Sequence, residues 1–220
     1  MPPKTPRKAE RPVFWIVAGP NGSGKSSLYN ETNIEGWGGS VWIINPDLLT
    51  LSIVESEGLS QAAANLAAVQ RVEAWLDASL EVYQTIGVET VLSSPKYQRL
   101  VESAQLRGFE VRMIYVTLRT PEEQLARIRL RVSEGGHDVP EDKVRSRRRR
   151  SFEQLAWFAR QVDRLFIFDN SGGEPVLMAS CTRGTPITWH QRPPAALRAE
   201  LAAAGVEGLP PVRASAKSRR

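Results

Sequence analysis

The residues most able to do chemistry form one short run with the full pattern G-x-x-x-x-G-K-[ST]. The run reads Gly19-Pro20-Asn21-Gly22-Ser23-Gly24-Lys25-Ser26. Glycines in this pattern let backbone N–H groups turn inward around a phosphate, and the N-terminus of the following helix adds partial positive charge. Lys25 would reach the β- and γ-phosphates, and the Ser26 hydroxyl would bind Mg²⁺. We therefore predict that this run and Ser27 bind ATP, and that the Lys25 ammonium faces solvent without nucleotide. The alternative is an ordinary glycine-rich turn.

Two carboxylates lie in or just after apolar runs that predict strands. Asp47 follows the run Val41–Ile44, so it would lie at the carboxyl end of a strand, where open α/β sheets bind ligands. It could accept a proton from a substrate hydroxyl, or it could cap a helix. Glu89 lies inside the run Val88–Leu92, and a buried carboxylate needs a partner: a Mg²⁺-bound water, an arginine or a substrate hydroxyl. The alternative for Glu89 is a solvated position facing an edge.

A set of arginines follows on either side of a glycine pair. Arg127 and Arg131 are four residues apart, on one face of an expected helix. After the loop Gly135–Pro140 come Arg145, Arg147, Arg148, Arg149 and Arg150. A mobile, arginine-bearing segment suits a lid that excludes water and places positive charge on a transferring phosphoryl group. Because successive helical residues point about 100° apart, only some of these arginines can face one site, and the others belong to a solvated face.

Strand and helix signals alternate from Val13 to about Cys181, which indicates a parallel sheet with helices on both faces. The apolar run Val13–Ala18 predicts a buried strand that ends at the phosphate loop, and a helix is expected from Lys25 to about Asn30. Further strands are expected at residues 41–44, 88–92, 111–118, 165–168, 176–180 and 187–189. Further helices are expected at residues 60–84, 95–107, 121–134 and 141–161. The predicted fold class is α/β, a three-layer P-loop NTPase fold with a mostly parallel sheet.

Several classes of protein are excluded by what the sequence lacks. It has no run of eighteen apolar residues and no apolar stretch before Val13, so we expect neither a membrane span nor a secretory signal peptide. The single cysteine, Cys181, excludes an intrachain disulfide framework and fits a reducing cytoplasm. The run Val111–Leu118 leads into an arginine, and no strand ends in a clear Walker-B aspartate. A motor or GTPase is therefore disfavoured, and a small kinase is favoured, with Mg²⁺ held by Ser26, phosphates and water.

The two ends of the chain differ from this body in composition. The first eleven residues carry a net charge of +3 and the last eight carry +4, so the rest carries −2 of the total of +5. We divide the chain into a disordered basic tail (1–12), a P-loop kinase domain (13–190) and a basic, Pro/Ala-rich tail (191–220). Residues 194–204 could form a short helix that need not belong to the core. We interpret the tails as solubilising, which makes a nucleic-acid partner the less favoured alternative.

Taken together, these residues resemble the zeta-toxin family of P-loop kinases over about Phe14 to Ala179. The matching pieces are Gly19–Ser26, Asn45-Pro46-Asp47, Glu89-Thr90-Val91-Leu92-Ser93, Arg127, Arg131, Gly135–Glu141, Arg147, Arg150 and Asp169-Asn170-Ser171. Their order and spacing together are specific, although most single pieces are common. One departure is that many relatives carry Thr-Leu-Ser-Gly after the Glu-Thr pair, whereas this chain has Val91 and Ser94 in that stretch.

The resemblance implies an ATP-dependent kinase of a small hydroxyl substrate, with ATP and Mg²⁺ as cofactors. For the toxins of the family the substrate is a UDP-activated amino sugar, and an antitoxin protein is the implied partner. Asp47 falls at the position of the catalytic base. The resemblance further implies substrate contacts by Glu89, Thr90 and Arg127, and phosphate binding in the lid by Arg131 and Arg147. The alternative function is a nucleotide-binding ATPase with a regulatory or nucleic-acid-linked role.

Overall fold

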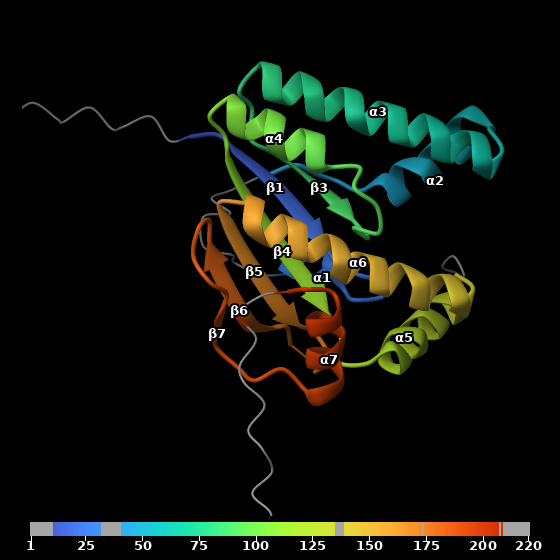
Figure 1. The fold of residues 1–220 in the computed structure, drawn as a ribbon. Coiled ribbons are helices and arrows are strands. Elements are labelled where there is room, and N and C mark those ends of the chain that lie inside the picture. The colour runs from blue at the N-terminus through green and yellow to red at the C-terminus, as the bar shows by residue number, and fades with distance from the viewer. Residues whose placement is uncertain (1–10, 32–40, 135–138, 173, 207, 209–220) are drawn as a thin grey trace, which may run out of the picture.

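One mixed sheet forms the centre of this computed structural model, which describes residues 11–31, 41–134, 139–172, 174–206 and 208 (Figure 1). Within these residues the sheet has seven strands in the order β2-β3-β1-β4-β5-β6-β7. The strands are β1 (Val13–Ala18), β2 (Ile43–Ile44), β3 (Ile86–Thr90), β4 (Glu110–Thr117), β5 (Arg164–Asp169), β6 (Val176–Thr182) and β7 (Thr188–Trp189). The first five strands pair in parallel, and β6 and β7 pair antiparallel. Residues 1–10 and 209–220 of the two basic tails and residues 135–138 of the expected lid lie outside the described residues.

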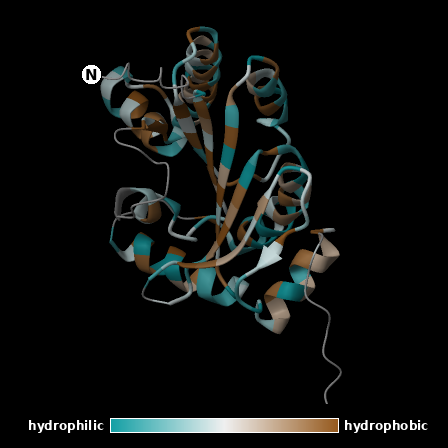
Figure 2. Ribbon diagram, turned by 90° about the vertical axis from the view of Figure 1, so that its left-hand side faces the viewer, coloured by the Kyte–Doolittle hydropathy of each residue, from teal (hydrophilic) through white to brown (hydrophobic). Residues whose placement is uncertain are grey.

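Helices cover both faces of the sheet, which confirms the predicted three-layer α/β fold. They are α1 (Lys25–Glu31), α2 (Pro46–Glu57), α3 (Gln61–Glu81), α4 (Gln98–Leu106), α5 (Pro121–Ser133), α6 (Glu141–Gln161) and α7 (Ala195–Ala203). On one face, α3, α4, α6 and α7 pack into a single core with strand residues such as Phe14 and Ile16. On the other face, Trp15 packs near Leu28 of α1. Hydrophobic residues run along the central strands (Figure 2). No helix in the described part of the chain is long and apolar enough to cross a membrane.

The parallel strands bring their carboxyl ends to one edge of the sheet. β1 lies between β3 and β4, and its last residue, Ala18, is aligned with Thr90 and Tyr115 of those strands. β5 lies beside β4, with Thr117 aligned to Asp169. The segments that follow β1, β2, β3 and β5 therefore begin at the same edge, where open α/β sheets bind ligands.

Helix α2 forms at this edge, although the sequence pattern predicts no helix over residues 46–57. Asn45 is the N-cap, because its Oδ1 accepts from the backbone N–H groups of Asp47 (3.0 Å) and Leu48 (3.2 Å), and a proline occupies the first turn. The apolar residues of α2 do not form one stripe, since Leu48 and Leu51 are exposed whereas Ile53 is buried. The Asn-Pro start was therefore a better signal for this helix than its hydrophobic period.

Strand β3 begins two residues before the run that predicts it and ends at Thr90 rather than Leu92. Gly87 lies inside the strand because a Cβ atom there would come 2.3 Å from Cδ1 of Ile43 and 2.9 Å from Cβ of Trp15. Glycine usually weakens a strand, and here close packing requires it. At the other end, Leu92 is buried with a positive φ of 59°, which turns the chain out of the strand.

Helix α7 packs into the core, whereas the sequence interpretation places residues 191–220 outside the domain. Leu197 and Leu201 are fully buried in the same apolar core as α6. Arg148 of α6 is 1% exposed and donates from Nη2 to Glu200 of α7 (2.7 Å) and to the Leu118 carbonyl oxygen (2.9 Å). Arg148 therefore holds α7 and β4 to α6 and is not available to a phosphate. The Pro/Ala-rich composition around α7 gives no sequence signal that this helix packs into the core.

The burial of α7 predicts that Leu201→Ala destabilises the protein. Removing a fully buried leucine side chain leaves a cavity, which typically costs about 2–5 kcal/mol in the free energy of unfolding. The matched control is Leu106→Ala on α4, where the leucine is 89% exposed, and its effect should stay within about 0.5 kcal/mol. Urea unfolding measures both variants. If the two leucines gave the same small loss, α7 would not be part of the folded core.

Candidate functional site

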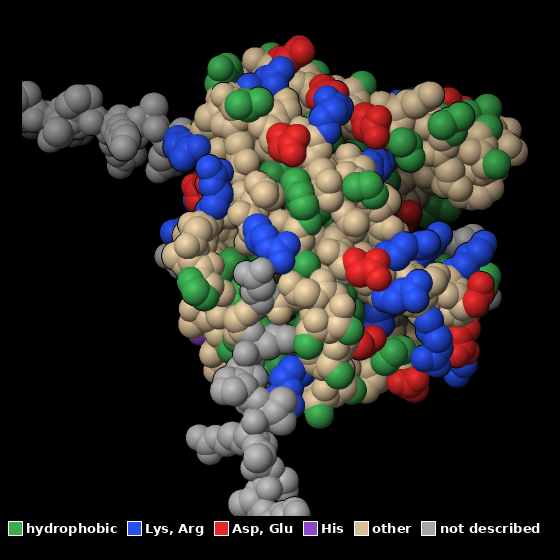
Figure 3. All heavy atoms as spheres, viewed as in Figure 1, with side chains coloured by type: hydrophobic (Ala, Val, Ile, Leu, Met, Phe, Trp, Pro, Cys, Tyr) green, Lys and Arg blue, Asp and Glu red, His purple; other side chains and the backbone are tan. Residues whose placement is uncertain are grey.

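The candidate site is a cavity of about 550 Å³ at the carboxyl edge of the sheet. On the surface, Lys and Arg side chains gather over α5 and α6, below a hollow that separates them from α2 (Figure 3). The predicted site residues that line the cavity are Asn21, Gly22, Gly24, Lys25, Ser26, Ser27, Asp47, Glu89, Thr90, Arg127, Arg131 and Arg147. Gly19, Pro20 and Ser23, the remaining predicted residues of the loop, are not among the lining residues.

The phosphate loop has a shape that requires glycine at two positions. Gly19 and Gly24 have positive φ angles of 145° and 84°. A Cβ atom on Gly19 would lie 2.0 Å from the Val116 carbonyl oxygen of β4, and one on Gly24 would lie 2.2 Å from Nδ2 of Asn170. Asn170, just after β5, donates from that nitrogen to the Ser23 carbonyl oxygen (2.9 Å). Contacts from two neighbouring strands therefore fix the path of the loop.

Lys25 does not face solvent, contrary to the expectation from sequence. It is 7% exposed, and its Nζ donates to the carbonyl oxygens of Gly19 (2.9 Å) and Pro20 (3.1 Å). Burial lowers the pKa of the ammonium, while the carboxylates of Glu89 and then Asp47 act in the opposite direction. The loop backbone thus holds the Lys25 ammonium beside the position where the loop would bind an anion.

Glu89 is a buried carboxylate with several protein partners on the inner strand β3, so the solvated edge alternative is wrong. Its Oε2 accepts from Ser26 Oγ (2.8 Å), Tyr29 Oη (3.0 Å) and Asn45 Nδ2 (3.0 Å). Its Oε1 lies 3.9 Å from Lys25 Nζ. Burial, and then the charge of Glu89, raise the pKa of the Tyr29 hydroxyl, which therefore stays protonated as a donor at neutral pH. Glu89 thus organises the phosphate-loop serine and lysine.

Asp47 lies in the first turn of α2, on the cavity lining, and is not the cap of that helix. The cap is Asn45, so the capping alternative for Asp47 is wrong. Asp47 is exposed, and in the described residues no hydrogen bond or ion pair to its carboxylate is found. Asp47 and Glu89 are the two carboxylates among the described lining residues. The first is open to a ligand, whereas the second is occupied by protein donors.

The arginines separate into two groups, as helical geometry requires. Arg127, Arg131 and Arg147 line the cavity, and Arg127 also donates to the Asn170 carbonyl oxygen beside the phosphate loop. The others face away. Arg145 pairs with Glu122 and Glu141, Arg148 is buried against α7, Arg149 pairs with Glu153, and Arg150 is exposed. One arginine of the run 145–150, Arg147, therefore reaches the cavity.

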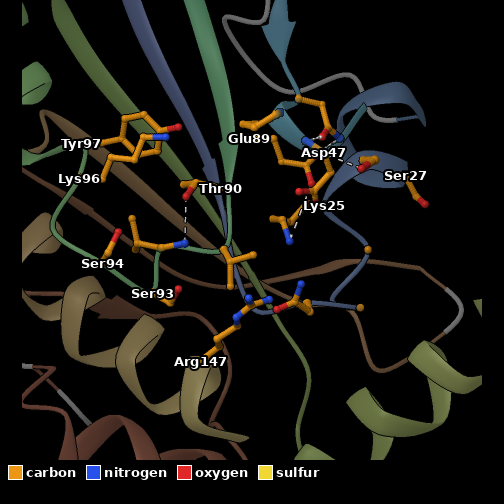
Figure 4. Close-up of a pocket in the computed structure, with 18 of the residues that line it drawn as sticks. Lys25, Ser27, Asp47, Glu89, Thr90, Ser93, Ser94, Lys96, Tyr97 and Arg147 are labelled. Atoms are coloured by element: carbon orange, nitrogen blue, oxygen red, sulfur yellow. Dashed lines mark hydrogen bonds and ion pairs between the residues drawn. The ribbon is translucent and has the colours of Figure 1, made fainter. Parts of the chain in front are cut away.

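The sequence analysis assigns no role to several residues that the structure places in the site. Asn45 and Asn170 position Glu89 and the phosphate loop, and both lie in the motif pieces Asn-Pro-Asp and Asp-Asn-Ser. Lys96 and Tyr97 line the side of the cavity opposite Ser27 (Figure 4). No local pattern distinguishes Lys96 from a surface lysine. Its place depends on the path of the chain between β3 and α4.

Comparison with protein families matches residues 2–179 to the zeta toxin family. The chain belongs to this family. It is 28% identical over 146 residues to an uncharacterised protein of Haemophilus influenzae, a match that covers 62% of this chain and 98% of that protein.

The fold is shared with solved structures at low sequence identity. One, from the PezAT chromosomal toxin–antitoxin system of Streptococcus pneumoniae, has a TM-score of 0.55 and 17% identity over 77% of this chain and 72% of the other. AvrRxo1-ORF1:-ORF2 with ATP has a TM-score of 0.64 and 18% identity over 94% of this chain and 67% of the other. A Chloroflexus aurantiacus protein, suggested to be a kinase, has a TM-score of 0.50 and 19% identity over 64% and 78%. Family and fold together support a P-loop phosphotransferase.

Proposed function

We propose that this member of the zeta toxin family transfers the γ-phosphoryl group of ATP to a hydroxyl group of a small molecule, with a UDP-amino sugar as the first substrate to test. The observation that carries the proposal is that the phosphate-loop Lys25 and the exposed carboxylate of Asp47 line the same cavity, close enough for the charge of Asp47 to act on the Lys25 ammonium. A site that only bound a nucleotide would have no use for an open base facing the phosphates. An ATP-dependent reaction of this kind would place the protein in the cytoplasm.

The residues of the chain supply two parts of this reaction. Asp47 would accept the proton of the substrate hydroxyl as its oxygen attacks the γ-phosphorus in line with the departing ADP oxygen. Lys25, with Arg131 and Arg147, would stabilise negative charge on the transferring group. Both arginines line the same cavity as Lys25, so the positive charge surrounds the place where it is needed.

The residues present also fit a magnesium ion. Mg²⁺ takes oxygen ligands in octahedral geometry and keeps several waters, so it needs few protein ligands. The Ser26 hydroxyl is such a ligand, and the Glu89 carboxylate, 2.8 Å from it, could accept hydrogen bonds from the water shell. When bound, Mg²⁺ neutralises charge on the β- and γ-phosphate oxygens. Ser26 would therefore be a direct ligand of the Mg²⁺ ion, and Glu89 would orient Ser26 and the water shell.

Glu89→Gln is predicted to raise the Mg²⁺ requirement for ATP binding. The amide keeps the size of the side chain and removes the negative charge that orients Ser26. Loss of an outer-shell partner typically weakens metal affinity by about 10–100-fold. Calorimetric titration of ATP at several Mg²⁺ concentrations measures this, with Glu102→Gln, an exposed change on α4, as control. An unaltered Mg²⁺ dependence would remove Glu89 from the metal site.

The decisive experiment is a phosphorylation screen with ATP and Mg²⁺ in which products are read by mass spectrometry. The panel contains UDP-amino sugars, simple sugars and sugar acids, and a reaction without acceptor reports bare ATP hydrolysis. A phosphorylated acceptor is the expected result. ATP hydrolysis with no phosphorylated acceptor would favour the alternative ATPase function. Retention on DNA or RNA that disappears when both tails are deleted would then favour a nucleic-acid-linked role.

An antitoxin protein is the partner we propose, because the chain belongs to the zeta toxin family and shares its fold with a structure from a toxin–antitoxin system. Growth of a bacterial host that expresses the wild-type chain, compared with the Lys25→Ala variant, tests for toxicity. Wild-type growth in both cultures would argue against an antitoxin. Growth arrest that depends on Lys25 would justify a search for the partner.

A further inference from the structure

Lys96 is a cationic side chain of the cavity that the chemistry above does not use. It lies in the segment between β3 and α4 and lines the cavity together with Ser93 and Ser94. Its Nζ lies 4.9 Å from the centre of the Tyr97 ring. Figure 4 shows Lys96 and Tyr97 on one side of the cavity, and Ser27, Asp47 and Lys25 on the other, with Thr90 between the two groups. Lys96 is therefore placed away from the phosphate loop.

The backbone on both sides of Lys96 is held firmly. Leu92 and Tyr97 are each 2% exposed, so the segment between them is anchored in the core at both ends. The Leu92 backbone N–H donates to Thr90 Oγ1 (3.0 Å), which fixes the exit from β3. A long cationic side chain that starts from such a segment reaches a defined part of the cavity.

The ammonium of Lys96 lacks a carboxylate partner in the described part of the chain. No hydrogen bond or ion pair to it is found there, and the ammonium lies over the Tyr97 ring. Its neighbour three positions on, Arg99, instead pairs with Asp77 (3.0 Å). Lys96 is half-buried, and this burial lowers its pKa more than the nearby charge of Glu73 raises it. A partly desolvated cation of this kind is stabilised by an anionic ligand.

We propose that Lys96 is the specificity-determining residue for an anionic group, a phosphate or a carboxylate, on the hydroxyl substrate. The inference rests on the proposed function, since it assigns the side of the cavity away from the phosphate loop to the phosphoryl acceptor. The anion would bind the Lys96 ammonium, and the acceptor hydroxyl would extend toward Asp47 and Lys25. The hydroxyls of Ser93 and Ser94 line the same side and could donate further hydrogen bonds.

The kinetic test compares acceptors that differ in one charged group. N-acetylglucosamine 1-phosphate is paired with N-acetylglucosamine, and gluconate with glucose, using the full chain with ATP and Mg²⁺. We expect wild type to prefer the charged member. Lys96→Ala should raise its KM about tenfold or more, because hydrogen bonds to charged groups are among the stronger ones, while the KM for ATP stays unchanged. Lys96→Arg should restore much of the loss, and Lys143→Ala, an exposed lysine change on α6, should have no effect.

A second readout does not depend on turnover. The full chain is treated briefly at pH 8 with an N-hydroxysuccinimide ester of acetic acid, and acetylation of Lys96 is followed by peptide mass spectrometry with Lys143 as reference. The charged compounds should protect Lys96, and their neutral partners should not. Phosphorylation of acceptors without protection of Lys96 and with an unchanged KM in Lys96→Ala would overturn this inference and leave the kinase intact. Protection without any phosphorylated product would overturn the kinase and leave the anion site. If Lys96 were not protected and no phosphorylated product formed, both the kinase and the anion site would be wrong.

Discussion

Lys25→Ala is expected to reduce ATP turnover by about 10²–10³-fold or more, the range seen when one preorganised donor to a developing negative charge is removed. The lysine Nζ already lies at the mouth of the loop, 2.9 Å and 3.1 Å from the Gly19 and Pro20 carbonyl oxygens. Moving it onto a phosphate would need little rearrangement, and Lys25 is the cationic side chain of the loop. Stopped assays of ADP release at saturating ATP measure the loss.

The control for Lys25 keeps its packing. Lys25→Met retains the length of the buried side chain and removes the charge, so it separates electrostatic loss from a cavity left by alanine. Both variants should remain folded by thermal melting, because burial already disfavours the ammonium at this position, as its lowered pKa indicates. Wild-type turnover in a folded Lys25→Met protein would remove the phosphotransferase assignment.

Asp47→Asn is expected to lower turnover with the true substrate by about 10²–10⁴-fold while ATP binding persists, because a general base typically contributes that much. The structure sharpens this expectation. Asn45 supplies the cap of α2 through its own Oδ1, so the substitution leaves the capping hydrogen bonds in place. The charge lost from the first helical turn should cost only about 0.3–1 kcal/mol of stability. Single-turnover rates at saturating ATP give the chemical step directly.

Glu55→Gln provides the matched control for Asp47→Asn, since it removes a carboxylate from an exposed position of the same helix. It should leave turnover unchanged. If a folded Asp47→Asn protein turned over substrate at the wild-type rate, Asp47 would not be the base. Glu89, the other carboxylate on the cavity lining, would then be the next candidate, although three protein donors already occupy its Oε2.

The sequence by itself determined the features that depend on local pattern. The phosphate loop is contiguous, so the spacing of its glycines, lysine and serine along the chain is enough to predict their roles. The apolar runs predicted the parallel strands because strands buried on both faces are hydrophobic throughout. Helical periodicity also required that the arginines after residue 144 diverge, and of that run Arg147 reaches the cavity. The P-loop fold class and the type of most elements followed from these signals, whereas helix α2 did not.

Only the tertiary structure decided which distant groups meet. Glu89 could have faced solvent, an arginine or a substrate, and it receives Ser26 and Asn45, which lie 63 and 44 positions away, because β3 lies between β2 and β1. Lys25 is buried rather than solvated because its Nζ donates to the Gly19 and Pro20 carbonyl oxygens of its own loop and lies 3.9 Å from Glu89 of β3. Arg148 resembles its neighbours in sequence, yet its own position on α6 faces the core, and its side chain donates to Glu200. Partners of this kind are set by strand order and helix packing, which no local pattern encodes.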